Sequence, residues 1–127
     1  MAKKILIIED EELLLNLLKK KLSELGYEVL AAVDGLEGLE AIKETAPDLV
    51  LLDIVMPKMG GFEVLEKKQE DDSIKSIPVI IISNSGQPVE LEKAKQLGAK
   101  DWLIKTEFDP VEVVEKVIKQ IGDSNNN

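Results

Sequence analysis

Five short runs rich in apolar residues alternate with helical patterns along the whole chain, and few folds accommodate this order. The runs lie at residues 4–8, 28–32, 48–53, 78–83 and 101–104. Three of them are nearly continuous stretches of apolar residues, as expected of strands covered by helices on both faces. The run at 28–32 is more mixed, which favours an edge of the sheet. Strands that alternate with helices predict an α/β domain built on a parallel sheet.

Two helices are predicted in the first half of the chain. The apolar positions of the first are Leu14, Leu18, Leu22 and Leu25. Their spacing is helical, and Gly26 follows where a left-handed cap would end the helix. Asp34 and Glu37 have the spacing of a capping box that opens a second helix. This helix is expected to continue through Ala46, because Pro47 cannot extend it.

Three more helices are predicted in the second half. A short one is expected over 62–69, and another over 88–97 with Gly98 as its stop. Asp109, followed by a proline, opens the last helix. Its expected apolar stripe consists of Val114, Val117, Ile118 and Ile121. Residues 122–127 are polar and are predicted to form a frayed tail.

Composition limits the chemistry that the chain can perform. A length of 127 residues predicts one domain over 1–122 with a polar tail at 123–127. The absence of cysteine and histidine excludes thiolates, imidazole bases and the usual zinc sites. A net charge of −9 disfavours direct nucleic-acid binding. No apolar run approaches the ~20 residues of a membrane span, and no signal peptide is recognisable, so a cytoplasmic location is expected.

Polar residues stand where four of the predicted strands end. Glu9 and Asp10 follow the first, Asp53 closes the third, Ser83 closes the fourth and Lys105 follows the fifth. Ligands of open parallel sheets bind beyond the carboxyl ends of the strands, so these side chains are expected to converge. Crowded carboxylates favour a hard divalent cation, while a lysine and a hydroxyl suit an anion. The set predicts a site for a phosphoryl group held with Mg2+.

Each of these residues taken alone has a simpler explanation. Acids after the first strand stabilise a helix N-terminus through its dipole, which is the role expected of Glu11 and Glu12. Asp53 could merely end a strand, and Lys105 could be one of sixteen solvated lysines. The joint placement at strand ends favours the site. Within it, a carboxylate such as Asp53 is a competent nucleophile toward phosphorus.

Five blocks of the sequence match one known family in order. They are Ile7-Ile8-Glu9-Asp10-Glu11, Leu52-Asp53-Ile54-Val55-Met56-Pro57-Lys58-Met59-Gly60-Gly61, Ile81-Ile82-Ser83, Gly98-Ala99-Lys100-Asp101 and Trp102-Leu103-Ile104-Lys105. Over about residues 3 to 121, the chain resembles a response-regulator receiver domain, similar to the chemotaxis single-domain regulator. The resemblance implies a flavodoxin-like, doubly wound sheet of five parallel strands in the order 2-1-3-4-5, with five helices.

The resemblance also implies roles for the residues at the strand ends. Asp53 would accept a phosphoryl group from a phosphohistidine of a sensor histidine kinase or histidine phosphotransfer protein. Asp10, Asp53 and the Val55 carbonyl would bind Mg2+, and Glu9 would act mainly through water. Lys105 and Ser83 would hold the phosphoryl oxygens. The chain would thus catalyse only its own phosphorylation and dephosphorylation and would not be an enzyme with turnover.

In the family, this chemistry drives a switch. Movement of the Ser83 hydroxyl is coupled to rotation of the aromatic residue at position 102, here Trp102. The face formed by the fourth helix, fifth strand and fifth helix then changes and controls binding of a downstream protein. The resemblance names neither that target nor the cognate kinase. It is compatible with a monomer and with a phosphorylation-dependent dimer.

Three departures from the family pattern affect these expectations. Thr106 replaces the usual proline, which leaves open whether the Lys105–Thr106 peptide is cis as in the family. Trp102 is bulkier than the usual Tyr or Phe, so it is expected to resist inward burial. Asn84 and Ser85 replace the small residues often found after the switch hydroxyl. Val55 and Ser85 occupy positions that influence water access in the family, so the phosphate lifetime stays open.

Two other readings compete with this one. A phosphatase of the haloacid-dehalogenase type uses a similar set of residues but needs an Asp-x-Asp motif on its first strand. Here the candidate nucleophile closes the third strand, and Asp53-Ile54-Val55 lacks the second acid. A degenerate receiver would keep the fold and act only as a binding module. Intact Asp10, Asp53, Ser83 and Lys105 argue against it.

Overall fold

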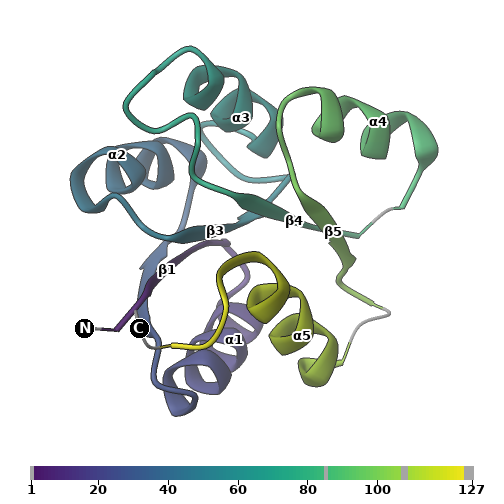
Figure 1. The fold of residues 1–127 in the computed structure, drawn as a ribbon. Helices are drawn as coiled ribbons and strands as arrows, with labels where there is room; N and C mark the ends of the chain where they lie inside the picture. Colours follow the sequence, from purple (N-terminus) through teal and green to yellow (C-terminus); the bar gives the residue numbers. More distant parts are fainter. Residues whose placement is uncertain (1, 85, 107–108, 125–127) are drawn as a thin grey trace.

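The computed structural model describes residues 2–84, 86–106 and 109–124. Its strands are β1 (Lys4–Ile8), β2 (Glu28–Ala32), β3 (Leu49–Asp53), β4 (Val79–Ser83) and β5 (Asp101–Ile104). They form one parallel sheet in the order β2-β1-β3-β4-β5 (Figure 1). The predicted fold is confirmed. The third and fourth strands begin one residue later than expected, and β2 lies at one edge, as its mixed composition predicted.

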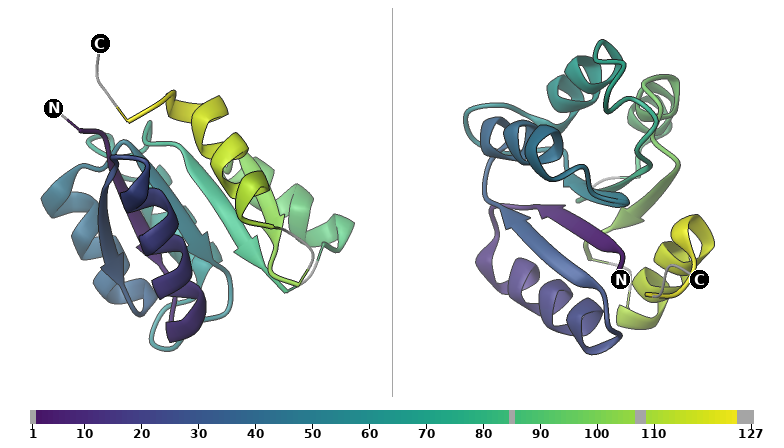
Figure 2. Two further views of the ribbon diagram at one scale, coloured as in Figure 1. Left: turned by 90° about the horizontal axis from the view of Figure 1, so that it is seen from below. Right: turned by 60° about the vertical axis from the view of Figure 1, so that its left-hand side comes forward.

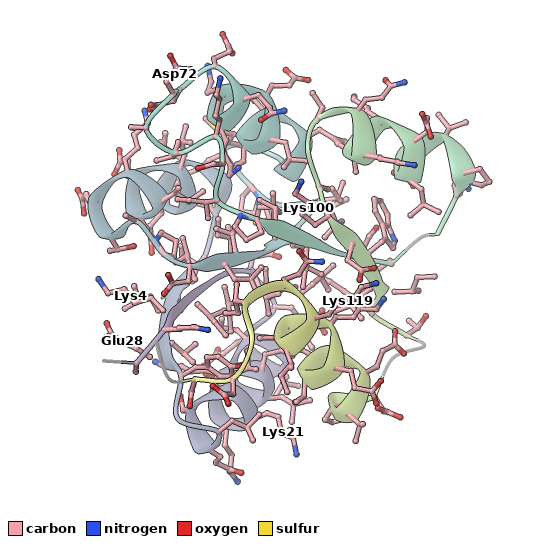
Figure 3. The ribbon with its side chains drawn as sticks, in the orientation of Figure 1. Lys4, Lys21, Glu28, Asp72, Lys100 and Lys119 are labelled. Atoms are coloured by element: carbon pink, nitrogen blue, oxygen red, sulfur yellow. The ribbon has the colours of Figure 1, made fainter. Side chains whose placement is uncertain are left out.

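Five helices cover the two faces of the sheet. They are α1 (Glu12–Glu24), α2 (Gly35–Thr45), α3 (Gly61–Gln69), α4 (Pro88–Gln96) and α5 (Pro110–Ile121). Helices α2, α3 and α4 lie over one face, while α1 and α5 lie over the other (Figure 2). Residues of β1 and β3 alternate between the two cores: Leu6 and Leu52 face the first, whereas Ile7 and Leu51 face the second. Side chains fill the space between sheet and helices (Figure 3).

The predicted capping residues do what their chemistry favours. The Asp34 side chain accepts a hydrogen bond of 2.8 Å from the Glu37 amide at the start of α2. Asp109 likewise accepts one of 2.9 Å from the Glu112 amide at the start of α5. Gly26 has a φ of +96° directly after the end of α1, as its place in the sequence predicts. These local signals fix where the helices begin and end.

The buried faces of two helices differ from the predicted stripes. On α1, Leu15 is buried in addition to Leu18, whereas Leu25 is 43% exposed. On α5, the fully buried residues are Val113 and Val117, and Ile118 is 46% exposed. The predicted stripe on α5 was therefore rotated by about one residue. Helical spacing identifies an apolar side, but the sheet surface beneath the helix decides which of two adjacent apolar residues turns inward.

The predicted frayed tail is wrong for residues 122–124, and residues 125–127 lie outside the described part of the chain. The Tyr27 hydroxyl donates a hydrogen bond of 2.6 Å to the Gly122 carbonyl. The Lys3 amide donates one of 2.9 Å to the Ser124 carbonyl. These bonds tie the end of α5 to the start of β1 and β2. Among the described residues, no helix has the length and apolar character needed to cross a membrane.

Candidate functional site

The carboxyl ends of four strands bring the predicted residues together. The register of the sheet sets Asp53 beside Ile82, and Ser83 beside Ile104, so the ends of β3, β4 and β5 are level. A cavity of about 320 Å³ opens there. It is lined by Asp10, Glu11, Asp53, Val55, Ser83, Asn84, Glu90 and Lys105. Five of the seven predicted site residues therefore share one cavity, and Glu9 reaches it through Lys105.

Lys105 is the centre of the polar contacts. Its Nζ lies 2.9 Å from Asp53 Oδ2, 3.0 Å from Glu9 Oε1 and 3.5 Å from Glu11 Oε2. Burial lowers the pKa of Lys105, but hydrogen bonds and charge attraction from Asp53 and Glu9 outweigh it and raise the pKa above its ordinary value. The side chain is therefore an ammonium ion and partly neutralises the buried acids.

Backbone pairing positions this lysine without the proline that the family usually carries. The Lys105 amide donates a hydrogen bond of 2.7 Å to the Ser83 carbonyl, which extends the β4–β5 pairing by one residue. No peptide bond between described residues is cis, so the Lys105–Thr106 peptide is trans. The lysine nonetheless reaches Asp53. This answers the question that the sequence left open.

Glu9 is fully buried directly behind the site. Burial raises its pKa to about 7, although hydrogen bonds from the Glu11 amide and from Lys105 act in the opposite direction. Its Oε2 accepts those two bonds, at 2.9 Å and 3.2 Å. Its Oε1 lies 3.0 Å from Lys105 Nζ but receives no hydrogen bond of normal geometry from the described residues. One buried carboxylate oxygen is thus left without a full partner.

The acidic residues fit a hard divalent cation. Carboxylate oxygens of Glu9, Asp10 and Asp53 lie within 4.8 Å of one another. Asp53 is 2% exposed, whereas Asp10 is exposed. The cluster is therefore buried at Asp53 and open to solvent at Asp10. An all-oxygen donor set with an incompletely bonded buried oxygen suits Mg2+. The donors present are therefore consistent with the predicted metal site.

Val55 lies on the loop that follows β3. Its amide donates a long hydrogen bond of 3.4 Å to Asp53 Oδ1, and the residue is 77% exposed. The Val55 backbone thus lies beside Asp53, and the role of its carbonyl as a ligand of Mg2+ stays a prediction. Ser83 is 5% exposed and lines the same cavity. Ser85, two residues further on and predicted to influence water access, lies outside the described residues.

Trp102 does not line this cavity. It is half-buried on β5 and borders a separate cavity of about 440 Å³ between α4 and β5. That cavity is lined by Leu91, Ala94, Lys95, Ala99, Lys100, Asp101 and Trp102. Trp102 is therefore separated from the acidic cluster, and its role as a switch residue stays a prediction.

Two acids of the cavity had no predicted role in the site. Glu11 was assigned to the helix dipole alone, yet its carboxylate contacts Lys105 at 3.5 Å. Glu90, in the first turn of α4, lines the cavity opposite the strand ends. The signal for Glu11 was its position two residues after Glu9. Glu90 could be found only by knowing that α4 starts beside the end of β4.

Comparisons with known proteins show which family this chain resembles in sequence and in fold. A family model described as response regulator receiver domain matches residues 5–118. The polar-differentiation response regulator DivK of Brucella anthropi is 32% identical over 127 residues, covering 98% of this chain and 100% of DivK. The structure of chemotaxis protein CheY4 of Vibrio cholerae superposes with a TM-score of 0.89 at 26% identity, covering 95% of this chain and 100% of that one.

A third comparison concerns the metal. The receiver domain of the sensor histidine kinase PA1611 from Pseudomonas aeruginosa is described with a magnesium ion coordinated in its active-site cleft. It superposes with a TM-score of 0.86 at 23% identity, covering 97% of this chain and 100% of that one. At this identity, the likeness shows a shared fold.

The strand order, the matched residues 5–118 and the similarity to DivK over its whole length agree with one another. Proteins of this kind are phosphorylation-activated switches of two-component signalling, and the predicted resemblance is confirmed. The chain belongs to the family of response-regulator receiver domains.

Proposed function

We propose that Asp53 accepts a phosphoryl group from a phosphohistidine of a partner kinase or phosphotransfer protein. The observation that carries the proposal is the position of Asp53, a nearly buried carboxylate that opens into the cavity at the strand ends and lies 2.9 Å from the Lys105 ammonium. The 127 residues contain no histidine, so the phosphohistidine must lie outside them. A cytoplasmic location, where such donors act in the family, is part of the proposal.

The cavity presents the protein groups that the transfer needs. A carboxylate oxygen of Asp53 attacks the phosphorus, the N–P bond of the phosphohistidine breaks, and the imidazole leaves with the electron pair. Asp10, Asp53 and the Val55 carbonyl would hold Mg2+, with Glu9 acting through water. When bound, Mg2+ supplies positive charge that offsets the repulsion between carboxylates and phosphoryl oxygens. The fit of Glu9, Asp10 and Asp53 to a cation supports this assignment, as does the magnesium described for the PA1611 receiver domain.

Lys105 and Ser83 would hold the transferred group. The Lys105 ammonium already contacts Asp53 and would pair with a phosphoryl oxygen, and the Ser83 hydroxyl lines the same cavity and would donate to another. Ser83 is the last residue of β4, so its movement toward that oxygen would shift the end of β4 and the segment that leads into α4. The cavity beside Trp102 leaves room for the α4–β5–α5 face to rearrange. We propose that this face binds the downstream protein.

The competing readings make different predictions. A haloacid-dehalogenase-type phosphatase is disfavoured, because Asp53 ends the third strand of a sheet whose order and sequence match receivers. A degenerate receiver would hold the fold without accepting phosphate. Such a module would have no need of a lysine that contacts two buried acids, whereas Lys105 Nζ lies 2.9 Å from Asp53 and 3.0 Å from Glu9.

Intact-mass measurement after incubation with acetyl phosphate and Mg2+ tests the proposal. The native chain should gain one labile phosphoryl group, and both Asp53→Asn and excess chelator should abolish the gain. Asp48→Asn is the matched control, because Asp48 precedes the same strand at its opposite end and its side chain accepts a hydrogen bond only from the Lys4 amide among the contacts described. It should be labelled like the native chain. Absence of any adduct would favour the degenerate receiver. Continuous turnover of phosphate esters would favour the phosphatase.

A further inference from the structure

The loop that carries Val55, residues 54–60, is closed by backbone hydrogen bonds. The Gly61 amide donates to the Ile54 carbonyl at 2.8 Å, and the Met59 amide donates to the Pro57 carbonyl at 2.7 Å. The second bond makes a three-residue turn centred on Lys58, whose φ is +67°. A lysine rarely adopts this backbone conformation, so contacts from outside the loop must hold it there.

The start of α2 supplies those contacts. Asp34 is 5% exposed and uses its two oxygens differently: Oδ1 caps α2, while Oδ2 lies 3.7 Å from Lys58 Nζ. Met59, at the end of the loop, is buried in the core shared with α2 and α3. The loop is thus attached to α2 through its strained residue Lys58 and through Met59, which follows it.

Gly35 sets the distance between α2 and the loop. A Cβ built on Gly35 would lie 2.7 Å from the Met59 carbonyl carbon and closer still to the carbonyl oxygen. These are backbone atoms, which cannot rotate away as a side chain would. Any larger residue at position 35 must therefore displace either the first turn of α2 or the loop.

We infer that Gly35 is a positioning residue for the phosphoryl-acceptor site, acting through Met59 and the loop 54–60. This inference rests on the proposed function, because it assigns the loop's Val55 carbonyl to Mg2+. A displaced loop would move the Val55 backbone, whose amide bonds Asp53 Oδ1. The metal-binding carbonyl and the orientation of the acceptor carboxylate would change together.

Gly35→Ala tests the inference, with Ile42→Ala as the matched control. Ile42 is fully buried on the same helix, two turns beyond Gly35, so its truncation destabilises the fold without adding an atom against the Met59 carbonyl. Mg2+ affinity is measured by isothermal titration calorimetry at a temperature where each variant is folded by circular dichroism. Gly35→Ala should weaken Mg2+ binding at least about fivefold, whereas Ile42→Ala should bind Mg2+ like the native chain. Unchanged affinity in folded Gly35→Ala would overturn the inference.

A measurement without metal separates this inference from the proposed function. In 1H–15N spectra of the metal-free protein, Gly35→Ala should shift the amides of Asp53 and Val55, and Ile42→Ala should leave them in place. If the native chain binds no Mg2+, the metal assignment fails, and these amide shifts alone decide whether Gly35 positions the site. If Gly35→Ala does not fold, Met59→Ala takes its place, since it loosens the buried residue through which Gly35 is inferred to act on the loop. Unmoved Asp53 and Val55 amides in that variant would overturn the inference.

Discussion

The two sides of the phosphoryl-acceptor site are packed differently. On the α2–α3 side, backbone approaches backbone at Gly35 and Gly61, and Val64 and Leu65 are almost fully buried. On the α4–β5 side, Ala94 is the one residue of α4 that is fully buried in the described chain. Figure 1 shows α4 beside β5, and a cavity of about 440 Å³ lies between them. The α2–α3 side is therefore closely packed around the site, whereas the α4–β5 side has space in which its elements can move.

This difference follows from how packing controls motion. A close-packed region has few alternative arrangements, because moving one side chain requires moving its neighbours. A helix with little buried surface opens at a lower free energy than the rest of the fold. Phosphorylation of Asp53 would therefore be expressed on the α4–β5 side, while the α2–α3 side keeps the acceptor and metal ligands in place.

Truncating one leucine on each side should give the largest difference. Leu65→Ala on α3 should lower the free energy of unfolding by about 3 kcal/mol, because the residue is 1% exposed and leaves a cavity in a tight core. Leu91→Ala on α4 should cost about 1 kcal/mol, because that side chain is half-buried beside an existing cavity. Urea unfolding measures both. Equal losses would mean that the two sides are equally packed.

Removing the central cation should have the next largest effect. Lys105→Met in the metal-free protein should cost about 2 kcal/mol, because Glu9 and Asp53 would stay buried without their counter-charge. Lys116→Met is the control: Lys116 pairs with Asp101 at 2.8 Å, but its side chain is 26% exposed. It should cost less than about 1 kcal/mol. Urea unfolding in excess chelator gives both values, and a larger loss in Lys116→Met would contradict the account.

The buried Glu9 makes the stability of the metal-free protein depend on pH. Its folded-state pKa is about 7 against an ordinary value of 4.5, so the folded protein holds a proton that the unfolded chain releases. The stabilisation is complete below pH 4.5 and is lost as the pH rises through 7. Lowering the pH from about 8 to about 5.5 should raise the free energy of unfolding by roughly 2 kcal/mol. Glu9→Gln should remove this rise, and an unchanged slope would assign it to another group.

The smallest expected effect concerns Trp102. Its bulk predicts resistance to inward burial, so fluoroberyllate with Mg2+ should change acrylamide quenching of its fluorescence by less than about twofold. It is the only tryptophan, so the signal is unambiguous. Strong protection from acrylamide would show that the ring moves inward and that its size does not bias the switch.

The sequence predicted most of this arrangement because the strands are encoded locally. Apolar runs place all five strands within one residue, and the polar residues after them identify Asp53, Ser83 and Lys105 as cavity-lining residues. The buried side of α5 was missed by one residue, because Val113 and Val114 are both apolar and only the sheet beneath distinguishes them.

Contacts between distant segments could not be predicted. The docking of residues 122–124 depends on the Tyr27 hydroxyl and the Lys3 backbone amide. Neither group belongs to a sequence motif that would predict the contact. The approach of Gly35 to the Met59 carbonyl is invisible in the sequence for the same reason. Glu90 enters the cavity only because α4 begins beside the end of β4. Such contacts arise from tertiary geometry that residue spacing does not specify.

Hydrogen–deuterium exchange tests the central claim that the state of Asp53 is expressed on the loosely packed side. The protein is compared with Mg2+ alone and with Mg2+ plus fluoroberyllate, a phosphoryl mimic. Backbone amides of α4 and β5 should change their exchange rates by at least about threefold, amides of α2 should change little, and Asp53→Asn should show neither change. Equal changes in α2 and α4, or changes that persist in Asp53→Asn, would contradict the account.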